Sequence, residues 1–282
     1  MTVVRNIDFL LDGIVTLPSL PASVAWITQL INSPKSNLSE VGQAIHSDPA
    51  LALKTLRLVN SAYYGLTHKV TSVDHAVSLL GLKVIKNLVY TATVFDSFRK
   101  GTDELLRHSV SCGIAMKVLS ECVPQAGIDG EEAFIYGLVH DIGKIVLSEF
   151  MPEDIERASA LSYARRVPGH VAEWEVIGTD HAEVGGRLVL NWGLSKTLSM
   201  AITSHHDLNR CKDPKTRPLA ACIAVADYLC NVSGILSSQE SVPSIHDEMW
   251  TASGIKNSQI PTVVDRFCAS LYTVDELIHM AK

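Results

Sequence analysis

Apolar residues recur along this chain at the spacing of α-helices. The three- and four-residue intervals that place side chains on one helix face occur at Val24, Ile27, Leu30 and Ile31. Residues 38–45 repeat the pattern, and the alternation of apolar and polar residues that is typical of strands is almost absent. We therefore expect an all-α protein, a multi-helix bundle, and we find no internal repeat.

Several helix boundaries carry their own signals. Asn37 followed by Glu40 resembles a capping box, in which each residue satisfies a backbone amide of the first turn. Asp48 before Pro49 is typical of an N-cap followed by proline at the first helical position. Further helices are predicted over residues 50–60, 73–80, 83–98 and 103–120.

The chain divides into three segments by this pattern. A length of 282 residues allows one large domain or two modest ones. We expect an N-terminal helical subdomain at 1–100, a histidine-rich helical subdomain at 101–231, and a loop with a C-terminal helical tail at 232–282. Residues 99–102 are the expected joint, and residues 231–244, rich in Ser with Gly and Pro, the expected loop.

Composition narrows the class of protein. Hydrophobic residues make up 47% of the chain, enough for a sizeable core, and charged residues 19%. The net charge of -6 and the lack of long Lys or Arg runs argue against a nucleic-acid partner. No signal peptide and no stretch long enough to span a bilayer are expected, so we predict a cytoplasmic protein with no membrane partner. The six cysteines show no CxxC spacing and are interpreted as reduced, buried thiols.

The second half of the chain is rich in residues that bind metals. Neutral imidazole and carboxylate are ligands that suit Mn, Fe, Co, Ni and Zn. Within about 120 residues, a span well inside one domain, lie His108, His140, Asp141, His181, His205, His206 and Asp227. Seven such positions together indicate a metal site more strongly than any one of them does.

The segment GLVHDIGKIVL is the most informative part of this set. His140, Asp141 and Lys144 are its polar residues, and burying an imidazole and a carboxylate is costly unless they are paired or metal-bound. We interpret the segment as helical, with His140 and Asp141 at neighbouring positions whose side chains diverge by about 100°. Lys144, one turn on, is placed to meet a phosphate. A buried His–Asp hydrogen bond with an exposed Lys144 is the alternative.

The other positions carry weaker signals. His108 has Glu104 one helical turn before it, so both could reach one ion, although a packed core histidine is the alternative. His181 begins a helix whose Gly185 and Gly186 would permit close approach of a neighbouring helix; capping by Thr179 or Asp180 is the simpler explanation of this segment. His205 and His206 lie beside a loop, where solvent exposure is equally expected. Asp227 is the charged residue of an apolar helix, so a metal or a donor partner is expected.

The order of these residues resembles the HD superfamily of metal-dependent phosphohydrolases. The fuller resemblance is to the HDOD domain, a relative found in bacterial signalling proteins, over roughly residues 15–230. The motifs that carry it are LPSLP at 17–21, DPAL at 48–51, LVNSAYYG at 58–65, AVSLLG at 76–81 and EAFIYGLVHDIGK at 132–144. The resemblance implies an all-helical HDOD fold and a cytoplasmic bacterial regulator.

The resemblance also implies which residues serve the site. By similarity to the HD-GYP phosphodiesterases, the metal ligands are Glu104, His108, His140, Asp141, His181, His205, His206 and Asp227, and Lys144 contacts phosphate. HDOD proteins often lack such ligands, and many are regarded as non-catalytic scaffolds, so this chain departs from that pattern. The GYP signature is missing after the histidine doublet, where the chain reads HHDLNRC, and this argues against cyclic di-GMP as the substrate.

Two functions are consistent with these residues. The first is a phosphohydrolase acting on a nucleotide or other phosphoester through two divalent cations, with Fe or Mn favoured and Ni, Co, Zn or Mg as alternatives. His108, His140 and Asp227 would hold one ion, and His181, His205, His206 and Glu104 the other, with Asp141 between them. The second is a signalling adaptor that binds a partner protein and whose metal site is structural or vestigial. Templates for nucleotide triphosphates and for acyl transfer (GxxxxGK[ST], GxGxxG, GxSxG) are absent.

Overall fold

The computed structural model describes residues 22–33, 36–97, 102–124, 128–237 and 245–281. Within these residues the regular elements are helices and there is no β-strand, so the predicted all-α class is confirmed. The LPSLP motif, the joint at 99–101 and loop residues 238–244 lie outside the described residues.

The helices follow one another with short connections. The N-terminal group comprises α2 (Ala22–Asn32), α3 (Leu38–His46), α4 (Pro49–Val59) and α5 (Val73–Ser97). The middle group comprises α6 (Asp103–Cys122), α7 (Gly130–Val139), α8 (Ile142–Phe150), α9 (Pro152–Arg165), α10 (Gly169–Ile177), α11 (His181–Asn191), α12 (Lys196–Ser204), the 3-10 turn η2 (Leu208–Arg210) and α13 (Arg217–Val232). The last group comprises α14 (Asp247–Ala252), the 3-10 turn η3 (Asn257–Gln259), α15 (Ile260–Ser270) and α16 (Tyr272–Ala281).

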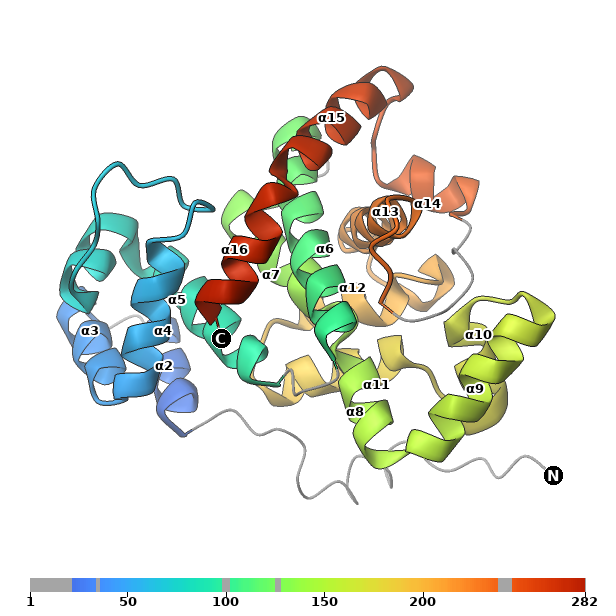
Figure 1. Ribbon diagram of the computed structural model, residues 1–282, viewed down its shortest axis with the longest axis horizontal. Helices are drawn as coiled ribbons and strands as arrows, with labels where there is room; N and C mark the ends of the chain where they lie inside the picture. Colours follow the sequence, from blue (N-terminus) through green and yellow to red (C-terminus); the bar gives the residue numbers. More distant parts are fainter. Residues whose placement is uncertain (1–21, 34–35, 98–101, 125–127, 238–244, 282) are drawn as a thin grey trace.

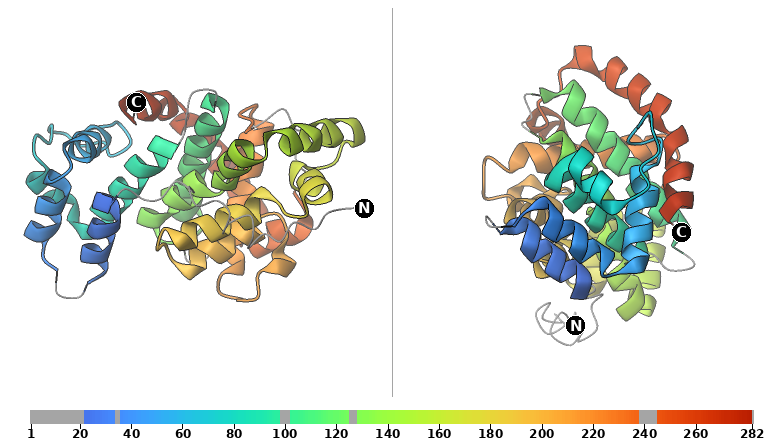
Figure 2. Two further views of the ribbon diagram at one scale, coloured as in Figure 1. Left: turned by 90° about the horizontal axis from the view of Figure 1, so that it is seen from below. Right: turned by 90° about the vertical axis from the view of Figure 1, so that its left-hand side faces the viewer.

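Helix α6 is the central helix of the molecule. The N-terminal helices gather at one end and the α9–α10 pair projects at the other (Figures 1 and 2). Helix α6 contacts α7, α13, α15 and α16, and α16 also contacts α4. The amide of Ala62 donates to the Glu276 carboxylate on α16 at 3.1 Å. One cluster of buried apolar side chains runs through all three groups, so the helices share a single core.

The sequence signals at α3 and α4 are confirmed. Asn37 caps α3, its side chain accepting from the Glu40 amide while the Glu40 carboxylate accepts from the Asn37 amide. Asp48 caps α4 by accepting from the Leu51 amide, with Pro49 as the first helical residue. These contacts are local in sequence, which is why the residue pattern alone predicts them.

Helix α5 is interrupted at Gly81. That residue has φ 77° and ψ 169°, so the helix is kinked where the sequence predicts the end of one helix and the start of the next. Within α5, Val73–Val94 is nevertheless long and apolar enough, by length and composition, to cross a membrane. The expectation that no stretch is long enough to span a bilayer is wrong by length and composition. It treated residues 73–80 and 83–98 as two separate helices. Half of the apolar window is buried in the protein (50%).

Glycines allow close packing around the middle helices. A Cβ atom added at Gly137 of α7 would lie 2.3 Å from the backbone oxygen of Cys112 on α6. One added at Gly143 of α8 would lie 2.0 Å from the backbone oxygen of His181 at the start of α11. The predicted close approach at Gly186 is also confirmed, since a Cβ there would lie 2.1 Å from the Thr203 hydroxyl on α12. Only glycine permits these backbones to approach so closely.

The sequence pattern predicts one continuous helix around His140, and this prediction is wrong. Helix α7 ends at Val139, His140 and Asp141 form a turn, and α8 begins at Ile142. Asp141 has φ -100° and ψ 10°, outside helical geometry. Both helices are buried, so apolar residues continue through the turn at the same spacing. The break between α7 and α8 therefore cannot be detected from the spacing of apolar residues.

Candidate metal centre

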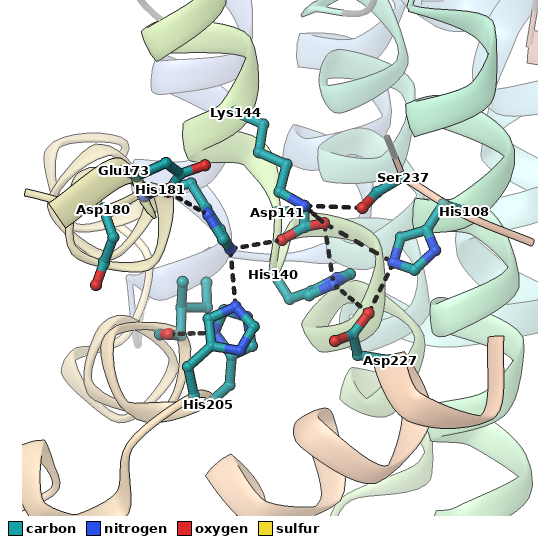
Figure 3. Close-up of polar contacts among 12 residues, drawn as sticks. His108, His140, Asp141, Lys144, Glu173, Asp180, His181, His205, Asp227 and Ser237 are labelled. Atoms are coloured by element: carbon teal, nitrogen blue, oxygen red, sulfur yellow. Dashed lines mark hydrogen bonds and ion pairs between the residues drawn. The ribbon is translucent and has the colours of Figure 1, made fainter. Parts of the chain in front are cut away.

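Elements that are distant in sequence bring seven polar residues together. Figure 3 shows Asp141 at the centre, with His181 on one side and His108 and Asp227 on the other. The contributing positions are His108 on α6, His140 and Asp141 in the turn between α7 and α8, His181 at the first position of α11, His205 and His206 directly after α12, and Asp227 on α13. These side chains are buried apart from His206, which is half-buried.

A first group of ligand atoms comes from α6, α13 and the α7–α8 turn. It consists of His108, Cys112, His140 and Asp227, whose ligand atoms lie within 4.8 Å of one another. The Asp227 Oδ1 atom is 3.0 Å from His108 Nε2 and 3.8 Å from His140 Nε2. The Asn231 amide donates to the same oxygen at 2.7 Å, which holds the Asp227 carboxylate in place.

A second group lies next to it. Asp141, His181, His205 and His206 also place their ligand atoms within 4.8 Å of one another. The two oxygens of Asp141 face different groups: Oδ1 is 3.1 Å from His181 Nε2, whereas Oδ2 is 3.5 Å from His140 Nε2. A carboxylate in this position can contribute to both groups.

Backbone carbonyls orient three of the imidazoles. A carbonyl can only accept, so the Nδ1 atom that contacts it carries the proton and Nε2 is left to face the site. The contacts are His108 Nδ1 to the Ile235 oxygen at 2.7 Å, His140 Nδ1 to the Gly137 oxygen at 2.7 Å, and His205 Nδ1 to the Ile202 oxygen at 2.6 Å.

A carboxylate that the sequence analysis missed orients the fourth imidazole. Glu173 on α10 is buried, and its Oε2 atom is 2.7 Å from His181 Nδ1 and 2.8 Å from the His181 amide nitrogen. A carboxylate behind a ligating histidine is a common arrangement at metal sites. In sequence Glu173 looks like its exposed neighbour Glu175, so no signal distinguished the two.

The residues fit a bound cation. The buried Nε2 atoms of His140 and His205 have no hydrogen-bond partner among the described residues, although both point into the groups. A buried polar atom without a partner costs about 1–3 kcal/mol. Imidazole nitrogens and carboxylate oxygens are ligands of divalent transition metals, so a cation at each group would satisfy these atoms.

Two histidines are held in their charged form when no cation is bound. Burial disfavours a positive charge on His108, but the Asp227 carboxylate raises the pKa of His108 to about 9. Burial acts in the same way on His181, and the Glu173 carboxylate raises the pKa of His181 to about 10. A cation must therefore displace protons from both residues to bind.

Two further members of the site, Asp141 and His205, are held in the form that ligates metal. Burial favours the neutral acid of Asp141, but the charges of His140 and Lys144 hold the pKa of Asp141 well below its usual range. Burial lowers the pKa of His205 to about 3, so His205 is neutral at physiological pH. Both ligands need no deprotonation before a cation binds.

Lys144 and Glu104 lie at one edge of the centre. Lys144 Nζ is 3.0 Å from Asp141 Oδ2 and donates to the Ser237 hydroxyl at 2.8 Å. Both Lys144 and Glu104 line a pocket of about 180 Å³ beside the centre. Glu104 is exposed and belongs to neither ligand group, so the structure does not bring this predicted ligand to a metal position.

A second pocket adjoins the centre. Its volume is about 260 Å³, and His205, His206 and Asp227 form part of its lining together with His170 and Tyr228. The imidazole of His170 stacks on that of His206, with ring centroids 4.2 Å apart and an interplanar angle of 9°. His170 is therefore part of the wall of this pocket.

Among the described residues, the remaining histidines and cysteines belong to neither ligand group, with one exception. His46, His68, His75, His246 and His279 are exposed, and His246 contributes to the lining of the second pocket. No cysteine is in a disulfide, and Cys112, Cys211, Cys222 and Cys230 are buried, whereas Cys122 is half-buried and Cys268 is exposed. The exception is Cys112, which the sequence analysis took for a core thiol and which lies in the first ligand group.

Comparison with known families agrees with the fold. The model of the HDOD domain matches residues 17–208, well over half of the chain. The chain belongs to the HDOD domain family.

Two relatives of the chain are described as uncharacterised proteins. An uncharacterised protein of Treponema pallidum (strain Nichols) is 27% identical over 256 residues, which cover 86% of this chain and 50% of the relative. The uncharacterised protein YuxH of Bacillus subtilis (strain 168) is 31% identical over 71 residues, 25% of this chain and 17% of the relative. The chain thus spans about half the length, or less, of these curated relatives.

Solved structures share the fold over nearly the whole chain. An HDOD domain protein of unknown function from Geobacter sulfurreducens has a TM-score of 0.78 at 23% identity, covering 96% of both chains. A protein of Shewanella amazonensis SB2B named as a candidate phosphohydrolase has a TM-score of 0.76 at 23% identity, covering 97% of this chain and 98% of that chain. Another from the same strain, named as a candidate metal-dependent phosphohydrolase, has a TM-score of 0.64 at 17% identity, covering 98% of this chain and 96% of that chain. At these identities the likeness shows the fold.

Proposed function

We propose that this protein is a metal-dependent phosphohydrolase of bacterial signal transduction, acting on a nucleotide or other phosphoester. The observation that carries the proposal is the pair of adjacent ligand groups, in which the buried Nε2 atoms of His140 and His205 have no hydrogen-bond partner in the part of the chain that the structure describes. The proposed ligands are His108, His140, Asp227, Asp141, His181, His205 and His206.

Asp141 belongs to the second group and its Oδ2 atom faces His140 of the first, and this arrangement favours two cations held close together. Divalent cations in such a pair acidify water and polarise phosphoryl oxygens, which is the chemistry that phosphoester hydrolysis requires. The residues of the chain supply the rest of the site. Glu173 orients His181, and the carbonyls of Gly137 and Ile202 orient His140 and His205.

Lys144 is placed to bind the phosphate group. Its ammonium lies between the Asp141 carboxylate and the 180 Å³ pocket, so a phosphoryl oxygen that enters this pocket would meet a fixed positive charge. Lysine acts here as a point charge rather than as a bidentate clamp.

A first experiment measures metal content and hydrolysis in the same preparations. Protein purified without chelator, then incubated with Fe(II), is expected to hold about two equivalents of metal, as two-metal sites do. Asp141→Ala removes the carboxylate that lies between His140 and His181, and it is expected to lose metal and hydrolysis of bis(p-nitrophenyl) phosphate. His75→Ala is the matched control, because His75 is exposed on α5 and is expected to change neither.

The outcomes separate the two functions. Loss of metal in His75→Ala would contradict the assignment of the ligands. A wild-type protein that binds no metal would overturn the proposal. A wild-type protein that binds metal but hydrolyses no phosphoester in a screen would contradict the phosphohydrolase and favour the adaptor function.

One feature of the N-terminal helices supports the adaptor as the second candidate. A pocket of about 820 Å³ lies between α4, the residues that follow it and α16, far from the ligand groups in sequence. Its lining includes Leu53, which is 52% exposed, together with Arg57 and Lys69. Apolar and basic side chains in one exposed hollow are suited to a protein partner.

A further inference from the structure

Cys112 lies where a further ligand of the first group would lie. It is one helical turn after His108 on α6, and its side chain is buried. Its Sγ atom is 3.4 Å from His108 Nε2, and it lies within 4.8 Å of the ligand atoms of His140 and Asp227. The sulfur is thus part of the ligand cluster rather than of the surrounding apolar core.

The distances within this group match a small coordination shell. Metal–nitrogen, metal–oxygen and metal–sulfur bonds of about 2.0–2.3 Å in tetrahedral geometry place neighbouring ligand atoms about 3.3–3.8 Å apart. The separations from His108 Nε2 are 3.4 Å to Cys112 Sγ and 3.0 Å to Asp227 Oδ1, and His140 Nε2 is 3.8 Å from Asp227 Oδ1. A cation could therefore be accommodated with small side-chain adjustments.

Charge balance favours a thiolate at this position. A divalent cation beside two neutral imidazoles carries two positive charges, of which Asp227 balances one, and a buried charge is costly unless it is balanced. The carboxylate of Asp141 belongs to the second group, and its Oδ2 atom is 3.0 Å from Lys144 Nζ. Cys112 is the further group of the cluster that can become an anion.

A second thiol lies next to Cys112. The Sγ atoms of Cys112 and Cys230 are 3.4 Å apart and both residues are buried, but Cys230 is not a member of the ligand group. Burial raises the pKa of the Cys112 thiol, so coordination there would release a proton, as it does at other thiolate sites. Cys230 offers a control residue of the same type in nearly the same environment.

We propose that Cys112 binds the cation of the first group as a thiolate and makes that position selective for thiophilic metals. The inference rests on the proposed metal-dependent function and specifies one ligand of that site. Thiolate ligands favour Zn(II), Fe(II) and Co(II), whereas Mg(II) and Mn(II) prefer oxygen ligands. The first position would thus discriminate against Mg(II) and Mn(II), and the second group, with imidazole and carboxylate ligands, would not share this preference.

X-ray absorption of the zinc-loaded protein tests the ligand directly. The wild type is expected to show a sulfur shell at about 2.3 Å from zinc in addition to nitrogen and oxygen at about 2.0–2.2 Å. Cys112→Ala is expected to lose the sulfur shell, and Cys230→Ala and Cys268→Ala to keep it. The Cys268 variant controls for zinc bound by an exposed thiol, and circular dichroism verifies that each variant folds.

Metal affinity provides the second readout. Cys112→Ala is expected to weaken zinc binding at one position by at least about tenfold, because loss of a residue that only orients a ligand already costs roughly 10–100-fold. Manganese binding is expected to change less, so the ratio of zinc to manganese affinity falls. If Cys112→Ala fails to fold, Cys112→Ser replaces it in both measurements. The sulfur shell in the spectrum of the wild type also tests the proposal without any variant.

The results distinguish this inference from the proposed function. Zinc bound by nitrogen and oxygen alone, or a sulfur shell lost in Cys230→Ala and kept in Cys112→Ala, would overturn the role of Cys112 while the metal-dependent function stands. A wild-type protein that binds neither zinc nor manganese would overturn both.

Discussion

At the scale of single residues, the site depends on side chains that fix other side chains. His181 has a carboxylate on either side, Glu173 at Nδ1 and Asp141 at Nε2. Among the described residues, the contacts of Glu173 with the ligand cluster are those with His181, so its role is to hold the ring and to raise its basicity. Replacing this buried carboxylate therefore tests whether the site is organised to bind metal.

Glu173→Gln is expected to reduce metal affinity by roughly 10–100-fold, the usual cost of removing such a partner. The glutamine keeps the size of the side chain but removes the charge that raises the pKa of His181. Competition with a chromogenic chelator measures the change. Glu175→Gln, two residues along the same helix, removes only an exposed ion pair with Arg165 and is expected to have no effect. Equal losses in the two variants would contradict the assignment.

At the scale of elements, close helix packing places the ligands. The turn between α7 and α8 carries His140 and Asp141, and Gly137 precedes it by a single turn of helix. Gly137 allows α7 to approach the backbone of Cys112 on α6, and its carbonyl accepts from His140 Nδ1. The same residue therefore determines both the spacing of two helices and the orientation of one ligand.

Gly137→Ala is expected to destabilise the protein by about 1–3 kcal/mol or more, as overpacking of a core does. The added methyl group would lie 2.3 Å from the Cys112 backbone oxygen, where no flexible side chain can move aside. Urea denaturation of the metal-free protein measures the loss. Gly130→Ala, in the same helix, places its methyl group 3.5 Å from the Ser120 hydroxyl and is expected to be close to neutral. A Gly137 variant as stable as wild type would contradict the packing argument.

At the scale of the whole molecule, the core brings together ligands that are up to 119 residues apart, from His108 to Asp227 (227 − 108). The resulting cluster concentrates charge inside the fold, so its protonation is linked to stability. His108 and His181, with pKa values of about 9 and about 10, bind protons more tightly in the folded protein than at the ordinary histidine pKa of 6.5.

The metal-free protein is therefore expected to lose stability as pH rises from 6.5 towards 9. In this window the folded chain holds protons that the unfolded chain has released, and each such proton changes the free energy of unfolding by about 1.4 kcal/mol per pH unit. Denaturation of chelator-treated protein at several pH values measures the slope. The metal-induced rise in Tm is expected to grow over the same range, because protons compete less with the cation. Stability that rises with pH in the metal-free protein would contradict the assigned pKa shifts.

The sequence by itself determined the all-α class, the capped starts of α3 and α4 and the chemical nature of the site. The helical class follows from the periodicity of apolar residues, and the caps follow from contacts between residues three or four positions apart. The chemical nature of the site follows from the cost of burying a charge, and all three can be recognised in the amino-acid sequence. It also indicated seven of the residues that the structure brings together, through their residue types and their resemblance to the HD superfamily.

Only the tertiary structure decided which side chains meet. Glu173, Cys112 and His170 have unremarkable neighbours in sequence, yet they contact His181, His108 and His206 respectively. Glu104 shares a helix face with His108 but lines the pocket beside the centre. The break between α7 and α8 lies within a continuous apolar stretch and cannot be detected from the sequence. The reason is physical: local spacing sets which face of a helix a residue occupies, whereas the packing of helices distant in sequence sets what that face meets.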